Sequence, residues 1–369
     1  MLRASQFKDE RATLERIEKF VSKTYFTDCN LRGKLYGPSL SPQTILHLSF
    51  GMAAPSFEEA TQALQEKGCP ISEGFTFGPS WSTHWFSLKL TLPLNWLGHR
   101  VHLHWNSGCE AMVWSGSGRP LQGLSGDFDR TDFALSSALT EEQRELSLFI
   151  ECAANEMFGA GKDGMINPPD PDKTFTLSQA KICIFRKDVY DLLMDFDVLY
   201  GLAKHLPKDN HRRYQALYTA NQMINLIDTD DLNSLEKARN LAQTFLGQKN
   251  GQSAFEILAV GNCHIDTAWL WPYKETRRKC ARSWASTLRL MDDYPQLTFA
   301  VSQAQQLVWL GEDYPELLEQ MQERAKEGRL VAVGGAWVEM DGYLPSGSRS
   351  SDNCCTVRLS YIDCLAGIY

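Results

Sequence analysis

Residues 254–271 read AFEILAVGNCHIDTAWLW, an apolar run followed by a His-x-Asp pair and a tryptophan-rich end. In extended backbone successive side chains point to opposite faces, so His264 and Asp266 face the same way and can share one ion. An imidazole nitrogen beside a carboxylate suits Zn²⁺, Co²⁺ or a similar divalent ion. The alternative is that this pair only caps the turn at the end of a strand.

The residues around this pair alternate between strand and helix patterns. We expect strands at 255–260, 297–302 and 329–334 and helices at about 273–293 and 303–327. Such β-α-β-α-β alternation implies a parallel sheet with covering helices. In this architecture the chemistry lies at the carboxyl ends of the strands, where the His-x-Asp pair, Glu339 and Asp341 fall. Glu339 and Asp341 either bond within a βα loop or contact a substrate.

Two other patterns fill the chain before residue 251. Apolar residues at helical spacing within 9–26 predict an amphipathic helix; they are Leu14, Ile17, Phe20 and Val21. Short alternating runs from Gly78 to about Phe185 are typical of a β-sandwich, and helical periodicity returns before the linker GQKNGQS at 247–253. The expected fold class is multidomain α+β. Its parts are an N-terminal helical segment (1–70), a β-sandwich (71–185), a helical connector (186–250), a partial parallel α/β domain (251–347) and a divergent tail (348–369).

The sandwich region is rich in aromatic and histidine side chains. Its tryptophans either stack on sugar rings or, as is more usual at alternating strand positions, fill a core; they are Trp81, Trp85, Trp96, Trp105 and Trp114. The histidines are His99, His102 and His104. His102 and His104 share a strand face with no acidic neighbour in sequence, which favours cross-strand packing over metal ligation.

Length and composition exclude several classes of partner. A chain of 369 residues exceeds what one hydrophobic core usually serves. A net charge of −8 without basic runs argues against nucleic acid or an anionic membrane as a partner. The first residues, MLRASQFKDERATLERIEKF, lack a signal-peptide core, and no stretch approaches the ~20 apolar residues of a membrane span, so we expect a cytosolic protein. Ten cysteines without C-x-x-C spacing indicate neither a zinc ribbon nor a disulfide framework.

Three segments carry a family resemblance. They are GNCHIDTAWLWP at 261–272, FAVSQAQQLVWL at 299–310 and GRLVAVGGAWVEMDGYLPSG at 328–347. In this order they resemble glycoside hydrolase family 38, the α-mannosidases, and most closely its cytosolic, cobalt-activated class. FGPSWSTHWF and FIECAANEMFG upstream are similar to the N-terminal region of that class. The resemblance covers roughly residues 1–347.

The resemblance implies a function and a site. Family members are retaining, metal-dependent hydrolases, here of terminal α-linked mannose on free oligosaccharides. His264 and Asp266 match two of the family's metal ligands, for Co²⁺ or Zn²⁺, and Trp269 matches an aromatic residue that packs against the bound sugar. The β-α-β-α-β region then forms the first part of a glycosidase barrel.

The resemblance also implies a nucleophilic Asp, in a D-x-F-G motif after the third strand, and a second His ligand. Neither occurs in 342–369, where the tail from Ser348 reads SRSSDNCCTVRLSYIDCLAGIY and departs from the family. Asp352 and Asp363 in this tail lack family-like context, so we assign no catalytic residue. We therefore expect a truncated, catalytically incomplete form that holds its metal weakly.

Two other functions stay open. The alternative interpretation is a non-catalytic carbohydrate-binding or regulatory isoform that uses its sandwich and helices. A metal-dependent deacetylase or phosphoesterase is a weaker hypothesis, because such sites need further ligands and no His follows His264. Homo-oligomerisation is compatible with the sequence but not indicated by any segment.

Overall fold

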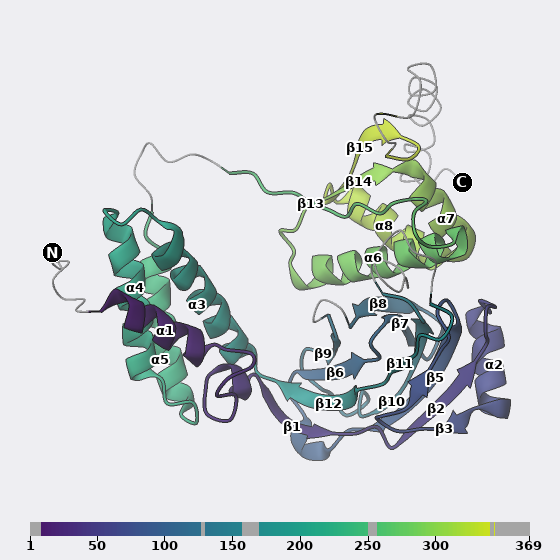
Figure 1. Cartoon of the computed structure of the whole chain (residues 1–369), viewed down its shortest axis with the longest axis horizontal. Helices are drawn as coiled ribbons and strands as arrows, with labels where there is room; N and C mark the ends of the chain where they lie inside the picture. The colour runs from purple at the N-terminus through teal and green to yellow at the C-terminus, as the bar shows by residue number, and fades with distance from the viewer. Residues whose placement is uncertain (1–8, 127–129, 157–169, 250–256, 340–342, 344–369) are drawn as a thin grey trace.

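The computed structural model describes residues 9–126, 130–156, 170–249, 257–339 and 343. A β-sandwich lies next to a helical bundle and below an α/β unit in the view of Figure 1. The bundle and the interior of the sandwich each have their own hydrophobic core. A third core combines the α/β unit with one face of the sandwich, so these two parts pack together. Within the described residues no helix has the length and apolar character needed to cross a membrane.

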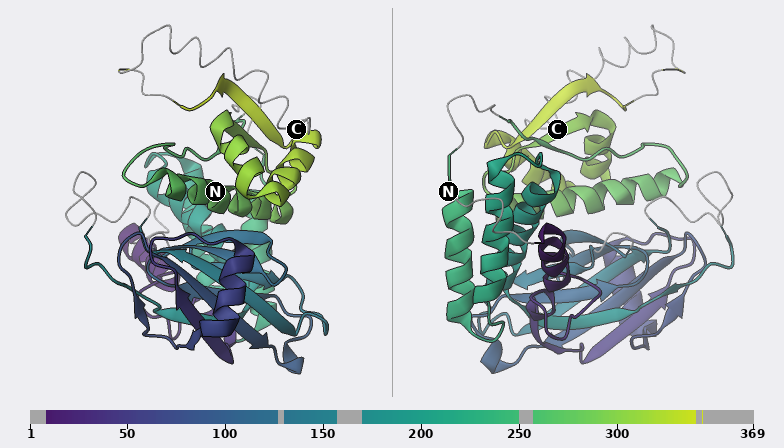
Figure 2. Two further views of the ribbon diagram at one scale, coloured as in Figure 1. Left: turned by 90° about the vertical axis from the view of Figure 1, so that its right-hand side faces the viewer. Right: turned by 60° about the vertical axis from the view of Figure 1, so that its left-hand side comes forward.

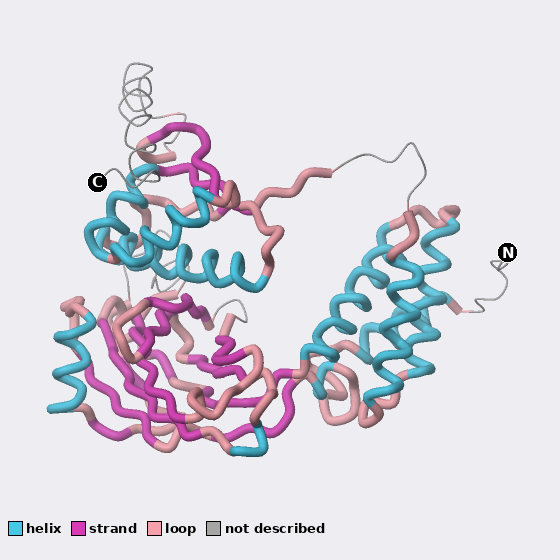
Figure 3. Tube along the Cα trace, turned by 180° about the vertical axis from the view of Figure 1, so that it is seen from behind, coloured by secondary structure: helices cyan, strands magenta, loops and turns pink. Residues whose placement is uncertain are grey.

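Two antiparallel sheets form the sandwich (Figure 3). The first has the order β1 (Tyr36–Leu40), β12 (Gln179–Phe185), β6 (Val101–Asn106), β9 (Asp132–Ser136). The second has the order β3 (Cys69–Pro70), β2 (Thr44–Ser49), β5 (Thr83–Thr91), β10 (Glu145–Ala153), β7 (Glu110–Ser115), β8 (Pro120–Ser125). A separate short ladder joins β4 (Thr76–Phe77) to β11 (Phe175–Thr176). The predicted β-sandwich is confirmed.

The six-stranded sheet is covered on both faces. Phe86 and Leu88 in β5 belong to the interior of the sandwich, whereas Trp85, directly before Phe86, belongs to the core shared with the α/β unit. Burial therefore runs without a break through the first six residues of β5, where a sheet with one solvated face would show alternation. The tryptophans of the sandwich fill a core, which was the more usual of the two roles considered for them. Trp85, Trp96, Trp105 and Trp114 are buried, and Trp81 is half-buried.

The sandwich begins earlier in the chain than the sequence indicated. Strands β1, β2 and β3 lie in the range 1–70, which was expected to be a helical segment. In the structure β1 pairs with β12, β2 pairs with β5, and β3 pairs with β2. Ile45 in β2 lies opposite Leu88 and is buried in the sandwich core. Helix α2 (Phe57–Lys67), which starts at a capping box between Ser56 and Glu59, packs on the same sheet. Short strands are stabilised mainly by pairing with strands elsewhere in the chain, so the local sequence pattern did not predict these three.

The predicted N-terminal helix is present as α1 (Glu10–Phe20), with Asp9 as its N-cap. It packs against the helical connector, where Ile17 is fully buried. The connector consists of α3 (Lys187–His205), α4 (His211–Leu226) and α5 (Leu232–Leu246). Figure 1 shows the four helices together at one side of the sandwich, apart from the α/β unit.

The α/β unit has the predicted alternation of strands and helices. Its parallel sheet has the order β13 (Gly261–Asn262), β14 (Phe299–Gln303), β15 (Leu330–Ala336). Its helices are α6 (Tyr273–Asp293), α7 (Ala304–Asp313) and α8 (Pro315–Lys326). They lie between the sheet and the sandwich, so the unit is stacked in layers of sheet, helices and sandwich (Figures 1 and 2).

Two predicted elements of this unit differ in the structure. Residues 257–260, the described part of the strand predicted at 255–260, form no strand, and Ile257 and Leu258 are 87% and 89% exposed. Pairing starts only at Gly261, where an added Cβ would lie 2.5 Å from the Phe299 ring, so this close approach requires glycine. The helix predicted at 303–327 is divided into α7 and α8, because Pro315 has no N–H to continue the first helix.

A buried ionic network joins α6 to the sandwich. Glu275 on α6 accepts from Arg278 at 2.6 Å and also pairs with Arg282. Arg278 reaches across to Glu151 in β10, with Nη1 3.0 Å from Oε1. Every one of these side chains is less than a tenth exposed. Charges removed from water this completely are tolerated only when each has a partner.

Glu110 in β7 completes the network on the sandwich side. Its Oε2 lies 2.6 Å from Lys279 Nζ and 2.7 Å from Arg282 Nη2. Burial alone would raise the pKa of Glu275, but the charges of Arg278, Arg282 and Lys279 outweigh it and lower that pKa from 4.5 to about 2. The network therefore holds Glu275 as a carboxylate at neutral pH.

We expect Glu275→Gln to reduce the free energy of opening of α6 by about 3–5 kcal/mol, because Arg278 and Arg282 then each lose one of their two buried carboxylate partners. Hydrogen exchange of the α6 amides measures this change. Glu312→Gln is the matched control: Glu312 pairs with Arg277 at 2.6 Å but its side chain is 56% exposed, and such pairs contribute about 0–1 kcal/mol. Equal effects of the two substitutions would contradict the prediction.

The same carboxylate makes stability depend on pH. Because the folded state lowers the pKa of Glu275, its stabilising contribution is complete above pH 4.5 and disappears as the pH falls towards 2. The difference in melting temperature between wild type and Glu275→Gln, measured by calorimetry, is therefore expected to narrow between pH 5 and pH 2. A difference that stays constant over this range would show that Glu275 does not titrate in this way.

Candidate active site

The His-x-Asp pair lies directly after β13, at the carboxyl end of the parallel sheet. His264 Nε2 is 3.1 Å from Asp266 Oδ1, so the two side chains face each other as the alternation of extended backbone predicts. The second ring nitrogen, Nδ1, contacts the carboxylate of Glu339, which follows β15. Hydrogen bonds to Glu339 and Asp266 outweigh partial burial and raise the pKa of His264. The ring is therefore held between two carboxylates.

This geometry fits part of a metal site. Metal bonds of about 2.1 Å that meet at angles of 90–110° place two donor atoms about 3.0–3.4 Å apart, which includes the separation of His264 Nε2 and Asp266 Oδ1. A carboxylate on the remote ring nitrogen, as Glu339 provides, is the usual way in which proteins orient a histidine ligand. Among the described residues no group of three or more His, Cys, Asp or Glu side chains forms a complete metal site. The pair would supply two ligands of such a site.

Gln303, at the end of β14, connects the parts of this loop. Its side chain is 1% exposed. Oε1 accepts from the Thr267 hydroxyl at 2.7 Å and from the Glu339 amide at 3.3 Å, while Nε2 donates to the Ile265 carbonyl at 2.8 Å. Gln303 therefore ties the His-x-Asp loop to the segment that carries Glu339. The sequence analysis did not single it out, although it directly follows the strand predicted at 297–302 and lies in the family-like segment 299–310.

The tryptophans of the loop form a second cluster. Trp269 is 38% exposed and meets Trp271 edge to face, with ring centroids 5.1 Å apart. Trp271 Nε1 donates to the Thr276 hydroxyl at 3.0 Å, and that hydroxyl donates to the Thr267 carbonyl at 3.0 Å. Trp269 is thus partly exposed beside a fixed loop.

Other candidate residues take different positions. Asp341 and the tail from Ser348, with Asp352 and Asp363, lie outside the described residues. His102 stacks on Phe185 as packing predicts, but it also has an acidic partner that the sequence did not reveal. Its Nδ1 lies 3.0 Å from Asp132 Oδ2, because β9 pairs with β6. This pair belongs to the sandwich and does not join the His264 loop.

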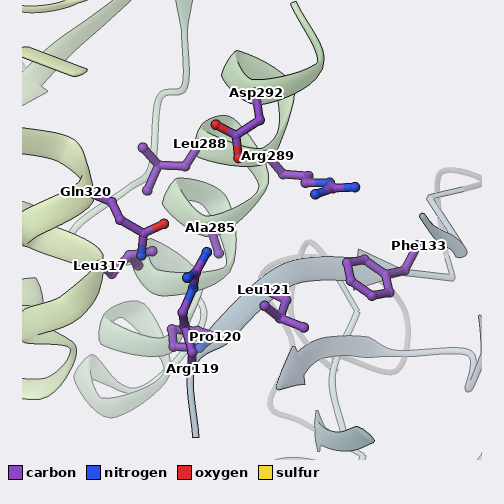
Figure 4. Close-up of a pocket in the computed structure, with 10 residues that line it drawn as sticks. All are labelled: Arg119, Pro120, Leu121, Phe133, Ala285, Leu288, Arg289, Asp292, Leu317 and Gln320. Carbon is purple, nitrogen blue, oxygen red and sulfur yellow. The ribbon is translucent and has the colours of Figure 1, made fainter. Parts of the chain in front are cut away.

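A small cavity lies between the sandwich and helices α6 and α8 (Figure 4). Arg119, Phe133, Arg289 and Asp292 are among its lining residues, and none of the lining residues belongs to the His264 loop. Its volume is about 40 Å³, far below the roughly 300–1,000 Å³ of ligand pockets. This cavity is therefore not the candidate sugar site.

Comparison with known families places the chain in a class of enzymes. Residues 41–183 match the family model described as "Alpha-mannosidase, jelly roll domain". Residues 254–357 match "Glycosyl hydrolases family 38 N-terminal domain". The two matches cover the sandwich and the α/β unit, which makes the protein a glycoside hydrolase by family. The second match extends past Ser348, so it includes the first residues of the tail that the sequence analysis set apart.

Individual relatives agree with the family models. Alpha-mannosidase 2C1 of Homo sapiens is 49% identical over 348 residues, which are 94% of this chain and 33% of the human protein. Alpha-mannosidase G of Dictyostelium discoideum is 41% identical over 344 residues, 92% of this chain and 31% of that protein. A structure of Bacteroides uniformis beta-glucuronidase has a TM-score of 0.28 at 13% identity, over 40% of this chain and 17% of the other. The chain belongs to glycoside hydrolase family 38, the α-mannosidase family, and spans about a third of the length of these two mannosidases.

We expect Gln303→Leu to reduce the free energy of opening of β14 by about 1–3 kcal/mol, since it leaves the buried Ile265 carbonyl without its donor. Hydrogen exchange of the β14 amides measures the change. Gln62→Leu is the control, because the Gln62 amide bonds only along its own exposed helix, to Glu66 at 3.1 Å. Unchanged exchange in Gln303→Leu would show that Gln303 does not hold the loop.

Proposed function

We propose that this chain carries the metal- and sugar-binding part of an α-mannosidase that hydrolyses terminal α-linked mannose with retention of configuration. One observation carries the proposal: His264 Nε2 and Asp266 Oδ1 approach to 3.1 Å at the carboxyl end of a parallel sheet, in a chain of family 38. The strands and helices from Gly261 to Ala336 are then the beginning of a larger α/β barrel. In the domain division expected from the sequence, this barrel starts at residue 251, after a helical connector that starts at residue 186.

The roles of the residues follow from their positions. His264 and Asp266 would hold a Co²⁺ or Zn²⁺ ion, and a bound ion would supply a positive centre that orients hydroxyls of the sugar. Glu339 accepts from Nδ1 of His264 and so orients the ring, and a metal bound at Nε2 would take the place of the proton that Nε2 directs at Asp266. Trp269, which is partly exposed, would pack against the apolar side of a pyranose ring.

We assign no catalytic carboxylate to the described residues. Retaining hydrolysis needs one carboxylate as nucleophile and a second as acid and base, about 5–5.5 Å apart. The family's nucleophile motif is missing from 342–369, so the proposal is that this chain alone binds a divalent metal weakly and turns over no substrate. Mannose-terminated free oligosaccharides are the proposed substrates of the complete active site, in the cytosol, which agrees with the class resemblance.

Titration of purified 1–369 with Co²⁺, followed by absorption spectroscopy, tests the metal site. We expect weak binding that disappears in His264→Ala and persists in His99→Ala, because His99 is exposed in a loop of the sandwich. Binding that survives His264→Ala would place the metal elsewhere and overturn the assignment.

Hydrolysis of an aryl α-mannoside by the same proteins tests the proposal that this chain alone is catalytically incomplete. We expect no turnover by 1–369 with Co²⁺ or Zn²⁺. Turnover that is lost in His264→Ala would show that the catalytic carboxylates lie within these 369 residues, and the proposed incompleteness would then be wrong.

A further inference from the structure

Lys279 lies between the sandwich and the candidate active site. Its Nζ is 2.6 Å from Glu110 Oε2 in β7 and 4.4 Å from the centre of the Trp271 ring. The side chain is 7% exposed, so the ammonium group is removed from water by these two neighbours and by the packing of α6. A cation in such a position is attracted both by the carboxylate and by the indole face.

The partners of Lys279 are themselves fixed. Glu110 also accepts from Arg282 at 2.7 Å and from the Asn155 amide at 3.3 Å, so its carboxylate has a defined orientation. Burial lowers the pKa of Lys279, and the charge of Glu110 works against that effect. The sandwich thereby holds the ammonium group over one particular ring.

Trp271 passes this restraint to the His-x-Asp loop. Its indole N–H bonds to Thr276, which is fully buried, and Thr276 bonds to the Thr267 carbonyl, one residue after Asp266. Trp269 rests edge to face on the same indole. A continuous series of contacts therefore runs from a strand of the sandwich to both the metal pair and the exposed tryptophan.

We propose that Glu110 and Lys279 are positioning residues that set the Trp271 indole and, through it, the geometry of Trp269 and of the His264–Asp266 pair. The sandwich then acts as part of the sugar-binding apparatus, although Glu110 lies outside the His-x-Asp loop. This inference rests on the proposed function of the loop.

Hydroxyl-radical footprinting of the full chain, with oxidation of each residue measured by mass spectrometry, tests the proposal. We expect Lys279→Met to raise the oxidation rates of Trp269 and His264, and to weaken Co²⁺ binding by about tenfold, as is usual when a group that orients a ligand is lost. His264 is the more informative reporter, because its polar contacts are with Glu339 and Asp266 and not with Lys279.

Two matched variants separate positioning from general loss of structure. Lys279→Arg keeps a cation for both Glu110 and the indole, and is expected to restore oxidation and Co²⁺ affinity towards wild type. Lys274→Met removes another lysine of α6, whose Nζ bonds to the Met52 carbonyl near the sandwich at 3.1 Å, and is expected to leave both readouts unchanged. Trp105, buried in the sandwich, reports whether each variant is folded.

If Lys279→Met also exposes Trp105, Thr276→Val decides the question, because it keeps the ionic network and removes only the link from Trp271 to Thr267. Unchanged His264 oxidation in a folded Lys279→Met, or in Thr276→Val where that one is needed, would overturn the positioning role. If the wild-type chain binds no Co²⁺, the proposed function is contradicted. The oxidation rates of Trp269 and His264 in the variants would still decide whether Lys279 positions the loop.

Discussion

The ionic network between α6 and the sandwich is the constraint on which the α/β unit depends. Arg278, Lys279 and Arg282 bring three positive charges to one buried face of α6, which itself supplies only Glu275 to that network. Glu110 and Glu151 of the sandwich supply the other carboxylates. Buried charge costs several kcal/mol per ion when it is unpaired, so α6 has a stable environment only against this sheet. The stability of α6 is therefore coupled to its contact with the sandwich.

This dependence reaches the candidate site because α6 begins immediately after it. The loop from Cys263 to Trp271 has no ladder of backbone hydrogen bonds of its own, and it is held instead by side chains at its two ends. Gln303 fixes the start of the loop from β14, and Thr276 fixes its end from the first turn of α6. Since α6 is oriented by the sandwich, the position of the loop follows from an interface that contains no residue of the proposed metal site.

Local patterns in the sequence predicted many of the strands and helices, but they did not predict which of these elements contact one another. Alternation predicted the sandwich and the β-α-β-α-β order, and the two-residue spacing predicted that His264 and Asp266 face each other. The pairing of Glu110 with Lys279, 169 residues apart, has no local signature. Strands β1 to β3 and the displaced start of β13 were missed for the same reason, since both are decided by strand partners distant in sequence.

In the part of the chain that the structure describes, the parallel sheet is covered by helices on one face only, which is why the interface between α6 and the sandwich has a large influence on the candidate active site. Helices α6, α7 and α8 cover the face of the sheet that is turned to the sandwich, whereas Val331 and Val333 in the edge strand β15 are each 41% exposed. Parallel sheets usually have both faces covered, so within the described residues the restraint on this sheet comes from one side only. The carboxyl ends of β13 to β15, where His264, Gln303 and Glu339 converge, are then held in place by the layer of helices beneath them. Among those helices α6 alone combines a buried ionic contact to the sandwich with a hydrogen bond to the His-x-Asp loop. A change in the stability of this interface is therefore transmitted through α6 to the geometry of the candidate site.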